Sequence, residues 1–108
     1  MLDTLQLLLK LVLLQHLLKW EYQPEHRSNS WRASVVEQRD QINDIIRTSP
    51  SLRRHPATMI DKAYRVARLR ASGETGLPLK RIPPTGPYSA AQALDENFWP
   101  GGGADFED

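Results

Sequence analysis

The feature that most constrains the fold of this chain is a leucine-rich run close to its N-terminus, LDTLQLLLKLVLLQHLLKWEY at residues 2–22. Leucine is a strong helix former, and the run ends before Pro24, which disfavours a helical conformation at the residue preceding it. We therefore predict a helix over residues 2–22. Two polar stripes lie on opposite sides of it: Asp3, Gln6 and Lys10, and then Gln15, His16 and Lys19. Between Leu7 and Leu14 the helix is apolar nearly all round, so it has to be covered on more than one side.

Two more long helices are predicted downstream of this run. The second covers residues 31–47, follows the capping cluster Ser28-Asn29-Ser30, and places its apolar side chains on one stripe. The polar residues that are expected to lie mostly on the solvent side of this helix are Glu37, Gln38, Arg39, Asp40 and Asp44. The third helix covers residues 57–72, and Gly73 is expected to end it.

The C-terminal part of the chain is richer in Pro and Gly and predicts less regular structure. A short helix is expected over residues 89–95, with Ser89 as its N-cap. Phe98-Trp99-Pro100 is expected to dock on the helices, and residues 101–108, GGGADFED, to form a disordered acidic tail. The predicted fold is all-α, a small bundle of three main helices plus a short C-terminal helix, in a single domain over residues 1–100.

Charge and cysteine content limit the environment of the chain. All 14 Lys and Arg residues lie between Lys10 and Arg81, and the chain after Arg81 holds acids but no base. A basic body with an acidic tail fits binding of a polyanion, and it fits equally a tail that folds over the body. The sequence has no Cys, which fits a reducing cytoplasm. The leucine run lacks a positive n-region and falls short of the ~20 residues that span a bilayer, so we expect a cytoplasmic protein without a membrane partner.

Motifs for catalysis or cofactor binding are absent from the sequence. It contains no G-x-S-x-G, no G-x-x-x-x-G-K-[ST] and no G-x-G-x-x-G. His16 and His26 are ten residues apart across Pro24, and His55 follows two arginines, so no two imidazoles share a helix face for a metal ion. We expect no catalytic residue, no cofactor and no metal site. An enzyme that uses a polar pocket without a known motif is kept as a third hypothesis.

Aromatic and basic residues concentrate where the first two predicted helices meet, in HLLKWEYQPEHRSNSWR at residues 16–32. Trp20 ends one helix and Trp31 begins the next, so both indoles can face the junction, while Pro24 restricts the link between them. An arginine here can stack on an indole or bond the open carbonyls at the end of the first helix. We favour a structural corner over a basic-aromatic binding surface. The candidate corner residues are Trp20, Tyr22, Pro24, Arg27, Trp31 and Arg32.

A row of basic residues suggests a nucleic-acid contact. Lys62, Arg65 and Arg68 recur every three residues on the third predicted helix, and such a row can neutralise phosphates. The alternative is a solvated helix face on which Asp61 pairs with Arg65. The candidate polyanion contacts are Arg53, Arg54, Lys62, Arg65 and Arg68.

Four strings, in the order HLLKWEYQPEHRSNSWR, SPSL, ETGLP and YSAAQALDENFWP, make the chain resemble the bacterial domain-of-unknown-function family 29, over residues 8–100. The most specific is W-x-Y-Q-P-E-x-R-S-x-S-W-R, from Trp20 to Arg32. The resemblance implies a small all-α protein of cyanobacteria and proteobacteria without an assigned activity, so it carries over no catalytic residue. Two departures stand out. Family members typically have a further N-terminal region, which implies a shortened member here, and Pro56 and Gly73 interrupt a stretch that stays helical in the family.

The leucine helix also predicts how the chain functions. Three short elements leave part of an all-round apolar helix uncovered, and a contiguous leucine patch is unusual on a soluble monomer. We therefore predict self-association or a protein partner at Leu7, Leu8, Leu11, Leu14 and Leu18. The first functional hypothesis is a non-enzymatic helical protein-protein interaction module, which works through the leucine face of the first helix or through the basic surface acting on an acidic partner. The second is a nucleic-acid-associated protein.

Overall fold

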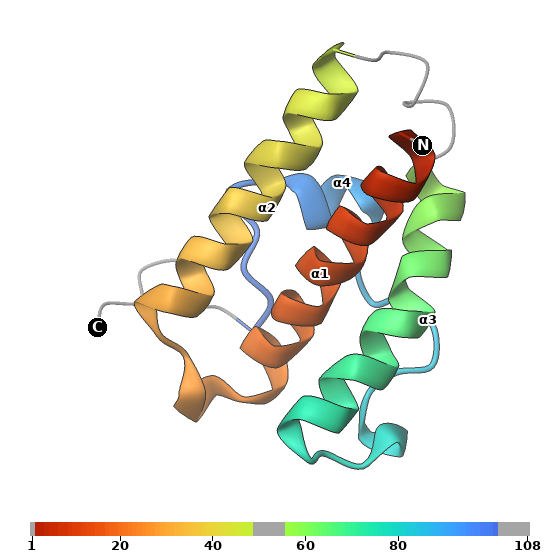
Figure 1. The fold of residues 1–108 in the computed structure, drawn as a ribbon. Helices are drawn as coiled ribbons and strands as arrows, with labels where there is room; N and C mark the ends of the chain where they lie inside the picture. The colour runs from red at the N-terminus through yellow and green to blue at the C-terminus, as the bar shows by residue number, and fades with distance from the viewer. Residues whose placement is uncertain (1, 49–55, 102–108) are drawn as a thin grey trace.

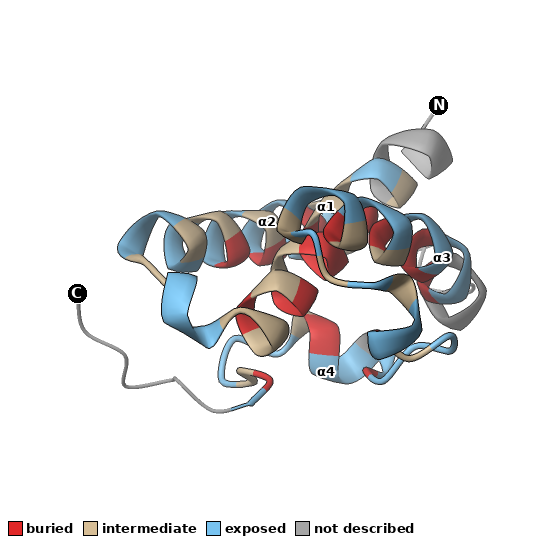
Figure 2. Ribbon diagram, turned by 90° about the horizontal axis from the view of Figure 1, so that it is seen from below, coloured by how far each residue is buried: buried red, intermediate tan, exposed pale blue. Residues whose placement is uncertain are grey.

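The computed structural model describes residues 2–48 and 56–101, which are all-α as predicted (Figure 1). The elements in chain order are α1 (Leu2–Tyr22), the 3-10 turn η1 (Pro24–His26), α2 (Asn29–Thr48), α3 (Pro56–Thr75), the 3-10 turn η3 (Leu79–Arg81) and α4 (Ala90–Leu94). α2 runs antiparallel to α1, and α3 runs beside α1 in the same direction (Figure 1). The three long helices form one layer with α1 in the middle, and α4 lies behind that layer (Figure 2).

α1 has the bounds predicted for it and supplies much of the core. α2 and α3 cover its two flanks, and α4 contacts it from behind, so the need for cover on more than one side is confirmed. The assignment of Lys10 to an outer polar stripe is wrong, because this side chain is 0% exposed. Lys10 shares a helix face with Leu13, Leu14 and Leu17, which are all buried. On a helix that is apolar all round, the spacing of the apolar residues does not decide which side of the helix faces the core.

α2 begins two residues before its predicted start and ends one residue later. The Ser28 hydroxyl accepts a hydrogen bond from the backbone N–H of Trp31 at 3.2 Å, so the expected cap is present. Val35, Arg39 and Ile42 are the buried residues of this helix. The expectation that Arg39 faces solvent is therefore wrong, and its spacing from Val35 and Ile42 places it on the same stripe.

α3 is longer than predicted at both ends, and Gly73 does not end it. Pro56 occupies the first position, where its missing N–H costs nothing. The helix continues through Gly73, which is exposed, and stops at Gly76, whose φ of 76° is a conformation that glycine adopts without strain. The Ser72 hydroxyl donates to the Leu77 carbonyl at 2.6 Å, which stabilises this end.

α4 is short and well capped. The Ser89 hydroxyl accepts from the Gln92 N–H at 3.1 Å, and the Gln92 side chain accepts from the Ser89 N–H at 3.0 Å. After α4 the chain docks on the helices, as predicted: Trp99 lies against Trp20, and Phe98 against Tyr88. Of the disordered acidic tail predicted over residues 101–108, Gly101 is described, in a turn, and residues 102–108 lie outside the described residues.

Candidate functional site

The corner between α1 and α2 is built around Trp20. This indole is fully buried, and its ring lies 4.7 Å from that of Trp99 between centroids. The Arg27 Nε donates to the Trp20 carbonyl at 2.8 Å, and its guanidinium lies 5.0 Å from the Trp20 ring. Arg27 thus satisfies an open carbonyl at the end of α1 and stacks on the same residue. Pro24 is exposed in the link, at the first position of η1, and Tyr22 is partly buried.

Trp31, the second tryptophan of the corner, has a different environment. It is only partly buried, and the Lys19 ammonium lies 4.9 Å above its ring. Arg32 is exposed, with its guanidinium 5.9 Å from the Trp99 ring. The main aromatic partner of Trp20 comes from the C-terminal segment and not from α2. Only Trp20 of this pair therefore belongs to the core.

Arg39 on α2 was not singled out as a site residue, although it organises the back of the molecule. Its Nε donates to the Ala93 carbonyl at 2.8 Å, and its Nη2 donates to the Phe98 carbonyl at 2.7 Å. Its guanidinium lies 5.3 Å from the Trp99 ring. Burial lowers the pKa of Arg39, and the Asp95 carboxylate opposes that effect. The sequence signal for this role was its position on the apolar stripe of α2.

The two terminal strings of the family resemblance meet in space. Glu21, in the first string, accepts a hydrogen bond from the hydroxyl of Tyr88, in the last. Burial, together with this carboxylate, raises the pKa of Tyr88 well above its usual range. Gly101 follows the last string, and a Cβ placed there would lie 3.1 Å from Arg27. The strings thus describe a structural junction in which the C-terminal segment locks the α1–α2 corner.

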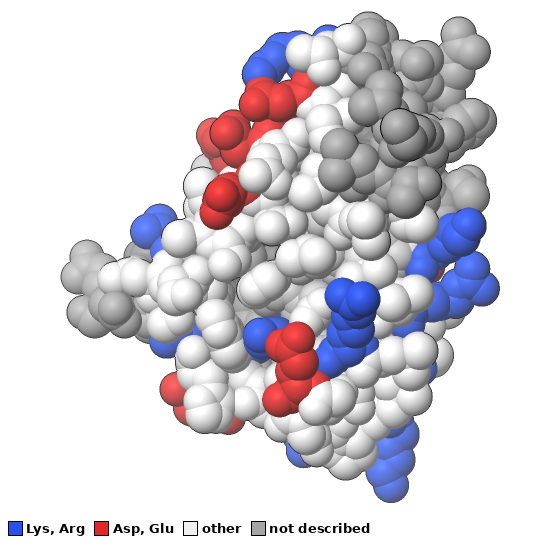
Figure 3. Space-filling model, in the orientation of Figure 1, with Lys and Arg blue, Asp and Glu red and all other residues white. Residues whose placement is uncertain are grey.

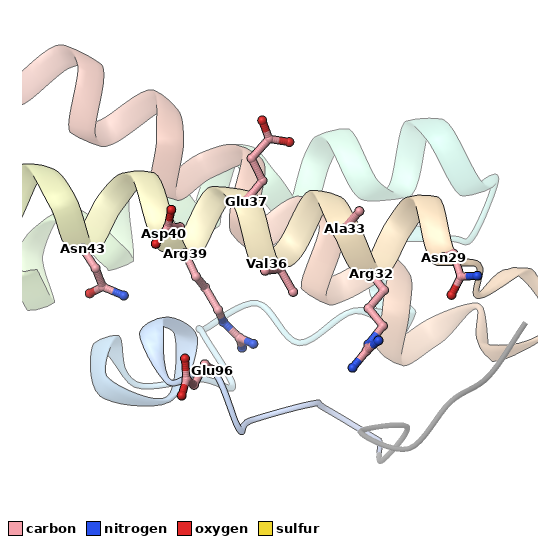
Figure 4. Close-up of a pocket in the computed structure, with 9 residues that line it drawn as sticks. All are labelled: Asn29, Arg32, Ala33, Val36, Glu37, Arg39, Asp40, Asn43 and Glu96. Carbon is pink, nitrogen blue, oxygen red and sulfur yellow. The ribbon is translucent and has the colours of Figure 1, made fainter.

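An open groove of about 630 Å³ runs along α2, on the side that faces α4 (Figure 4). Arg32 and Arg39 point toward the C-terminal segment, whereas the Glu37 side chain leaves α2 in the opposite direction (Figure 4). The Arg39 guanidinium is already bound to two carbonyls. The lining contains no Ser, Thr, Cys, His or Lys, so it holds no hydroxyl or thiol nucleophile paired with an imidazole or amine base. The lining residues are Asn29, Arg32, Ala33, Val36, Glu37, Arg39, Asp40, Asn43 and Glu96.

The predicted row of polyanion contacts is divided. Arg53 and Arg54 lie outside the described residues. Arg68 is partly buried, and it donates to the Ile82 and Leu79 carbonyls, at 2.9 Å each, so it holds the loop that follows α3. Lys62 and Arg65 are exposed on α3, and Asp61 makes no ion pair with Arg65.

Two large apolar side chains lie among the exposed cations of α3. Val66 is 41% exposed and Leu69 is 59% exposed. Arg70, on the next position, is exposed as well. We call this surface the outer face of α3; it consists of Lys62, Arg65, Val66, Leu69 and Arg70. In the described residues none of its three cations has an ion-pair partner within 4 Å.

The leucines proposed for self-association have separate environments. Leu11, Leu14 and Leu18 are buried in the core of the same chain, and Leu7 is partly buried against it. Leu8 alone among the five is exposed, at 50%. Any contact that α1 makes with a partner therefore centres on Leu8 and its neighbours.

Charge is unevenly distributed over the layer of long helices. Acidic side chains gather along the outer edge of α2, and basic side chains gather over α3 on the opposite edge (Figure 3). At the lower end of the layer the Lys19 ammonium contacts Glu74 at 2.8 Å, and Gln15 also donates to this carboxylate. The hydrogen bond from Lys19 is the main cause that lowers the pKa of Glu74.

Within residues 2–48 and 56–101, no three His, Cys, Asp or Glu side chains come together as a metal site. None of the helices in that part of the chain has both the length and the apolar character required to cross a membrane.

A family model described as "Domain of unknown function DUF29" matches residues 3–99. No curated protein and no solved structure matches the chain.

Proposed function

Because the chain belongs to the family described as Domain of unknown function DUF29, whose description carries no activity, we propose a function from its surface: it is a non-enzymatic helical protein-protein interaction module. It binds an acidic partner through the outer face of α3. The supporting observation is the exposure of Val66 and Leu69 among three cations without ion-pair partners in the described residues. Apolar contact supplies affinity at such a surface, and the surrounding charges supply orientation and association rate.

Nucleic-acid binding is the second candidate, because the same cations can contact phosphates. It would use Lys62, Arg65 and Arg70, since Arg68 is committed to backbone carbonyls. The two candidates differ in what they require of Leu69. A protein partner needs the apolar ridge, whereas phosphate contacts need only the charges.

The test compares three labelled probes by fluorescence anisotropy: an acidic amphipathic helical peptide, duplex DNA and single-stranded DNA. We expect the peptide to bind, and Leu69→Ser to weaken it by about tenfold, as truncation at an interface hot spot does. Val36→Ser is the matched control, because Val36 is 52% exposed on α2 and lies outside the outer face of α3. It should leave peptide binding unchanged.

Two results would overturn the protein-binding proposal. One is DNA binding that ignores Leu69→Ser and weakens with salt at a slope of about −3 in log K against log salt, as three phosphate contacts give. This result favours the second candidate. The other is no binding to any probe at low salt, which removes both candidates.

A further inference from the structure

The first half of α1 has an unusual arrangement, because a cation is buried while a leucine two positions away is exposed. Lys10 is 0% exposed and its ammonium has no hydrogen-bond partner among the described residues, whereas Leu8 is 50% exposed. Val12, one turn after Leu8, is only partly buried. An apolar strip in contact with water is unfavourable, and such strips on soluble proteins commonly mark an interface.

The face of α1 that carries Leu8 turns toward α3, and below the exposed Leu8 it is partly buried at Val12 and Lys19 and buried at Gln15. Leu8, Val12, Gln15 and Lys19 follow one another at steps of four, three and four residues, so they share a face. Gln15 and Lys19 both contact Glu74 on α3. This face of α1 therefore adjoins the edge of α3 that carries Glu74.

The adjoining edge of α3 is apolar and basic at the level of Leu8. Val66 and Arg70 precede Glu74 by eight and four residues, so they lie on the same side of α3. α1 and α3 run in the same direction, and Gln15 on α1 is level with Glu74 on α3. Leu8 precedes Gln15 by seven residues and Val66 precedes Glu74 by eight, so Leu8 is level with the turn that carries Val66. Leu8 and Val66 thus belong to one continuous surface. We call it the front face, and it comprises Leu8, Val12, Val66 and Arg70.

Opposite charges border this front face. Glu37, Asp40 and Asp44 are exposed on α2, and Lys62 and Arg65 are exposed on α3. Figure 3 shows acidic groups at the upper left and basic groups at the right, with a largely uncharged surface between them and groups of both signs below it. α1 runs between the two edges (Figure 1).

This arrangement is complementary to itself. A two-fold rotation about an axis parallel to α1, in front of the layer, lays α1 of one copy on α1 of the other. The same rotation brings the acidic edge of α2 in each copy opposite the basic edge of α3 in its partner. A contact of this kind uses the same surface on both copies and closes after two, as in most symmetric dimers.

We infer that the front face is a dimer interface and that its occupant is a second copy of this chain, with α1 packed on α1 and two α2–α3 charge contacts. The inference rests on the proposed interaction function, and it names the partner. The dimer covers Leu8 and Val66, and it brings cations that have no ion-pair partner among the described residues opposite acids.

Sedimentation equilibrium over a range of concentrations tests the dimer. We expect a monomer–dimer equilibrium in the micromolar range, and Leu8→Glu to raise the dissociation constant by at least about a hundredfold, because it places two carboxylates in the apolar centre. Val36→Glu introduces the same charge at a residue of similar exposure that lines the groove on α2, and it should leave the equilibrium unchanged. Circular dichroism on each variant separates loss of the dimer from loss of the fold.

A charge exchange tests the geometry. Glu37→Arg and Arg70→Glu should each weaken the dimer by about tenfold, since each creates two like-charge contacts. The double variant should bring the dissociation constant back to within a few-fold of the wild-type value, because the two charge pairs re-form with the signs exchanged. If the single variants weaken the dimer and the double variant gives no recovery, the α2–α3 pairing is wrong.

A folded wild-type chain that is monomeric up to about 100 µM would overturn the dimer. Binding of the acidic peptide then tests, independently of the dimer, whether the outer face of α3 binds an acidic partner. If the monomer binds the acidic peptide and Leu69→Ser weakens that binding, the interaction function stands and a second copy is not the partner. If the chain neither dimerises nor binds the peptide, both proposals fail.

Discussion

Two buried cations of this protein, Arg39 and Lys10, are 2% and 0% exposed, and they differ in the acceptors that they reach. Among the described residues Arg39 leaves only its Nη1 without a partner. Arg39 donates to two carbonyls of the C-terminal segment and lies beside the Trp99 ring. Within residues 2–48 and 56–101 the Lys10 ammonium has no hydrogen-bond partner, and the side chain shares its helix face with leucines. The guanidinium is planar and delocalised and can serve two acceptors at once, whereas an ammonium is a compact charge with a strong hydration shell.

The comparison shows that burial of a charge stabilises this fold only where acceptors have been positioned for it. At the Arg39 end the acceptors are the Ala93 carbonyl in α4 and the Phe98 carbonyl in the segment after it. At the Lys10 end the charge is desolvated without compensation, so it costs stability. The same half of α1 carries the exposed Leu8. The well-bonded region holds the fold together, and the poorly compensated region adjoins the surface we assign to association.

The largest effect is expected from the aromatic centre of the Arg39 end. Trp20→Ala should lower the free energy of unfolding by about 3–5 kcal/mol, because it removes a fully buried indole and its contact with Trp99. Urea denaturation followed by circular dichroism measures this change. A loss below 1 kcal/mol would mean that the C-terminal segment does not depend on this contact.

Arg39→Met should cost about 2–3 kcal/mol, since it leaves the Ala93 and Phe98 carbonyls without their donor. Arg39→Lys keeps the charge but has no fork to reach both carbonyls, so it should recover little of the loss. Full recovery by lysine in urea denaturation would show that charge, and not bidentate bonding, is what matters at this site.

Lys10→Met should act in the opposite direction and raise the free energy of unfolding by about 1–2 kcal/mol, because the thioether fills the space without a charge to desolvate. Burial lowers the pKa of Lys10 below 10.5, so above its folded pKa the unfolded chain binds more protons than the folded one.

Stability of the wild type should therefore rise with pH from the folded pKa of Lys10 up to 10.5, relative to Lys10→Met. The difference between the two proteins, measured by urea denaturation at several alkaline pH values, cancels the titration of the tyrosines. Destabilisation by Lys10→Met at neutral pH would contradict an uncompensated lysine.

The smallest of these effects is expected at the other tryptophan of the corner. Trp31→Ala should cost about 1 kcal/mol, because the side chain is partly buried and its contact with the Lys19 ammonium lies near the surface. Measured beside Trp20→Ala by the same method, it tests whether the two indoles have different roles. Equal losses at both positions would place Trp31 in the core after all.

Much of the local structure follows from the sequence. The bounds of α1, the Ser28 and Ser89 caps and the docking of Phe98 and Trp99 agree with the predictions. The helix bounds and the caps depend on interactions between residues close in sequence. The docking of Phe98 and Trp99 was predictable because two large apolar side chains have to be covered by the helices. Gly73 was misplaced as the end of α3, because helices tolerate an exposed glycine at a modest cost, and the tertiary structure places the positive φ at Gly76.

The candidate site was less predictable. The sequence shows which residues are charged, but Arg27, Arg39 and Arg68 contact backbone carbonyls while Arg65 and Arg70 remain exposed. A row of basic residues in the sequence does not show which of them bond backbone carbonyls and which stay exposed. That depends on which loop or segment of the fold lies next to each side chain. Arg68 belongs to the predicted row, and only the loop after α3 decides that it serves the fold.

The sequence by itself determined that this chain forms helices, where most of them begin and end, and that α1 needs cover on several sides. Helix propensity, caps and apolar spacing are local properties, and they are sufficient for those conclusions. Only the tertiary structure decided which side of α1 faces inward, and so made Lys10 a core residue and Leu8 a surface residue. The physical reason is that a helix with apolar side chains all round has no preferred orientation of its own, and packing against α2, α3 and α4 selects one.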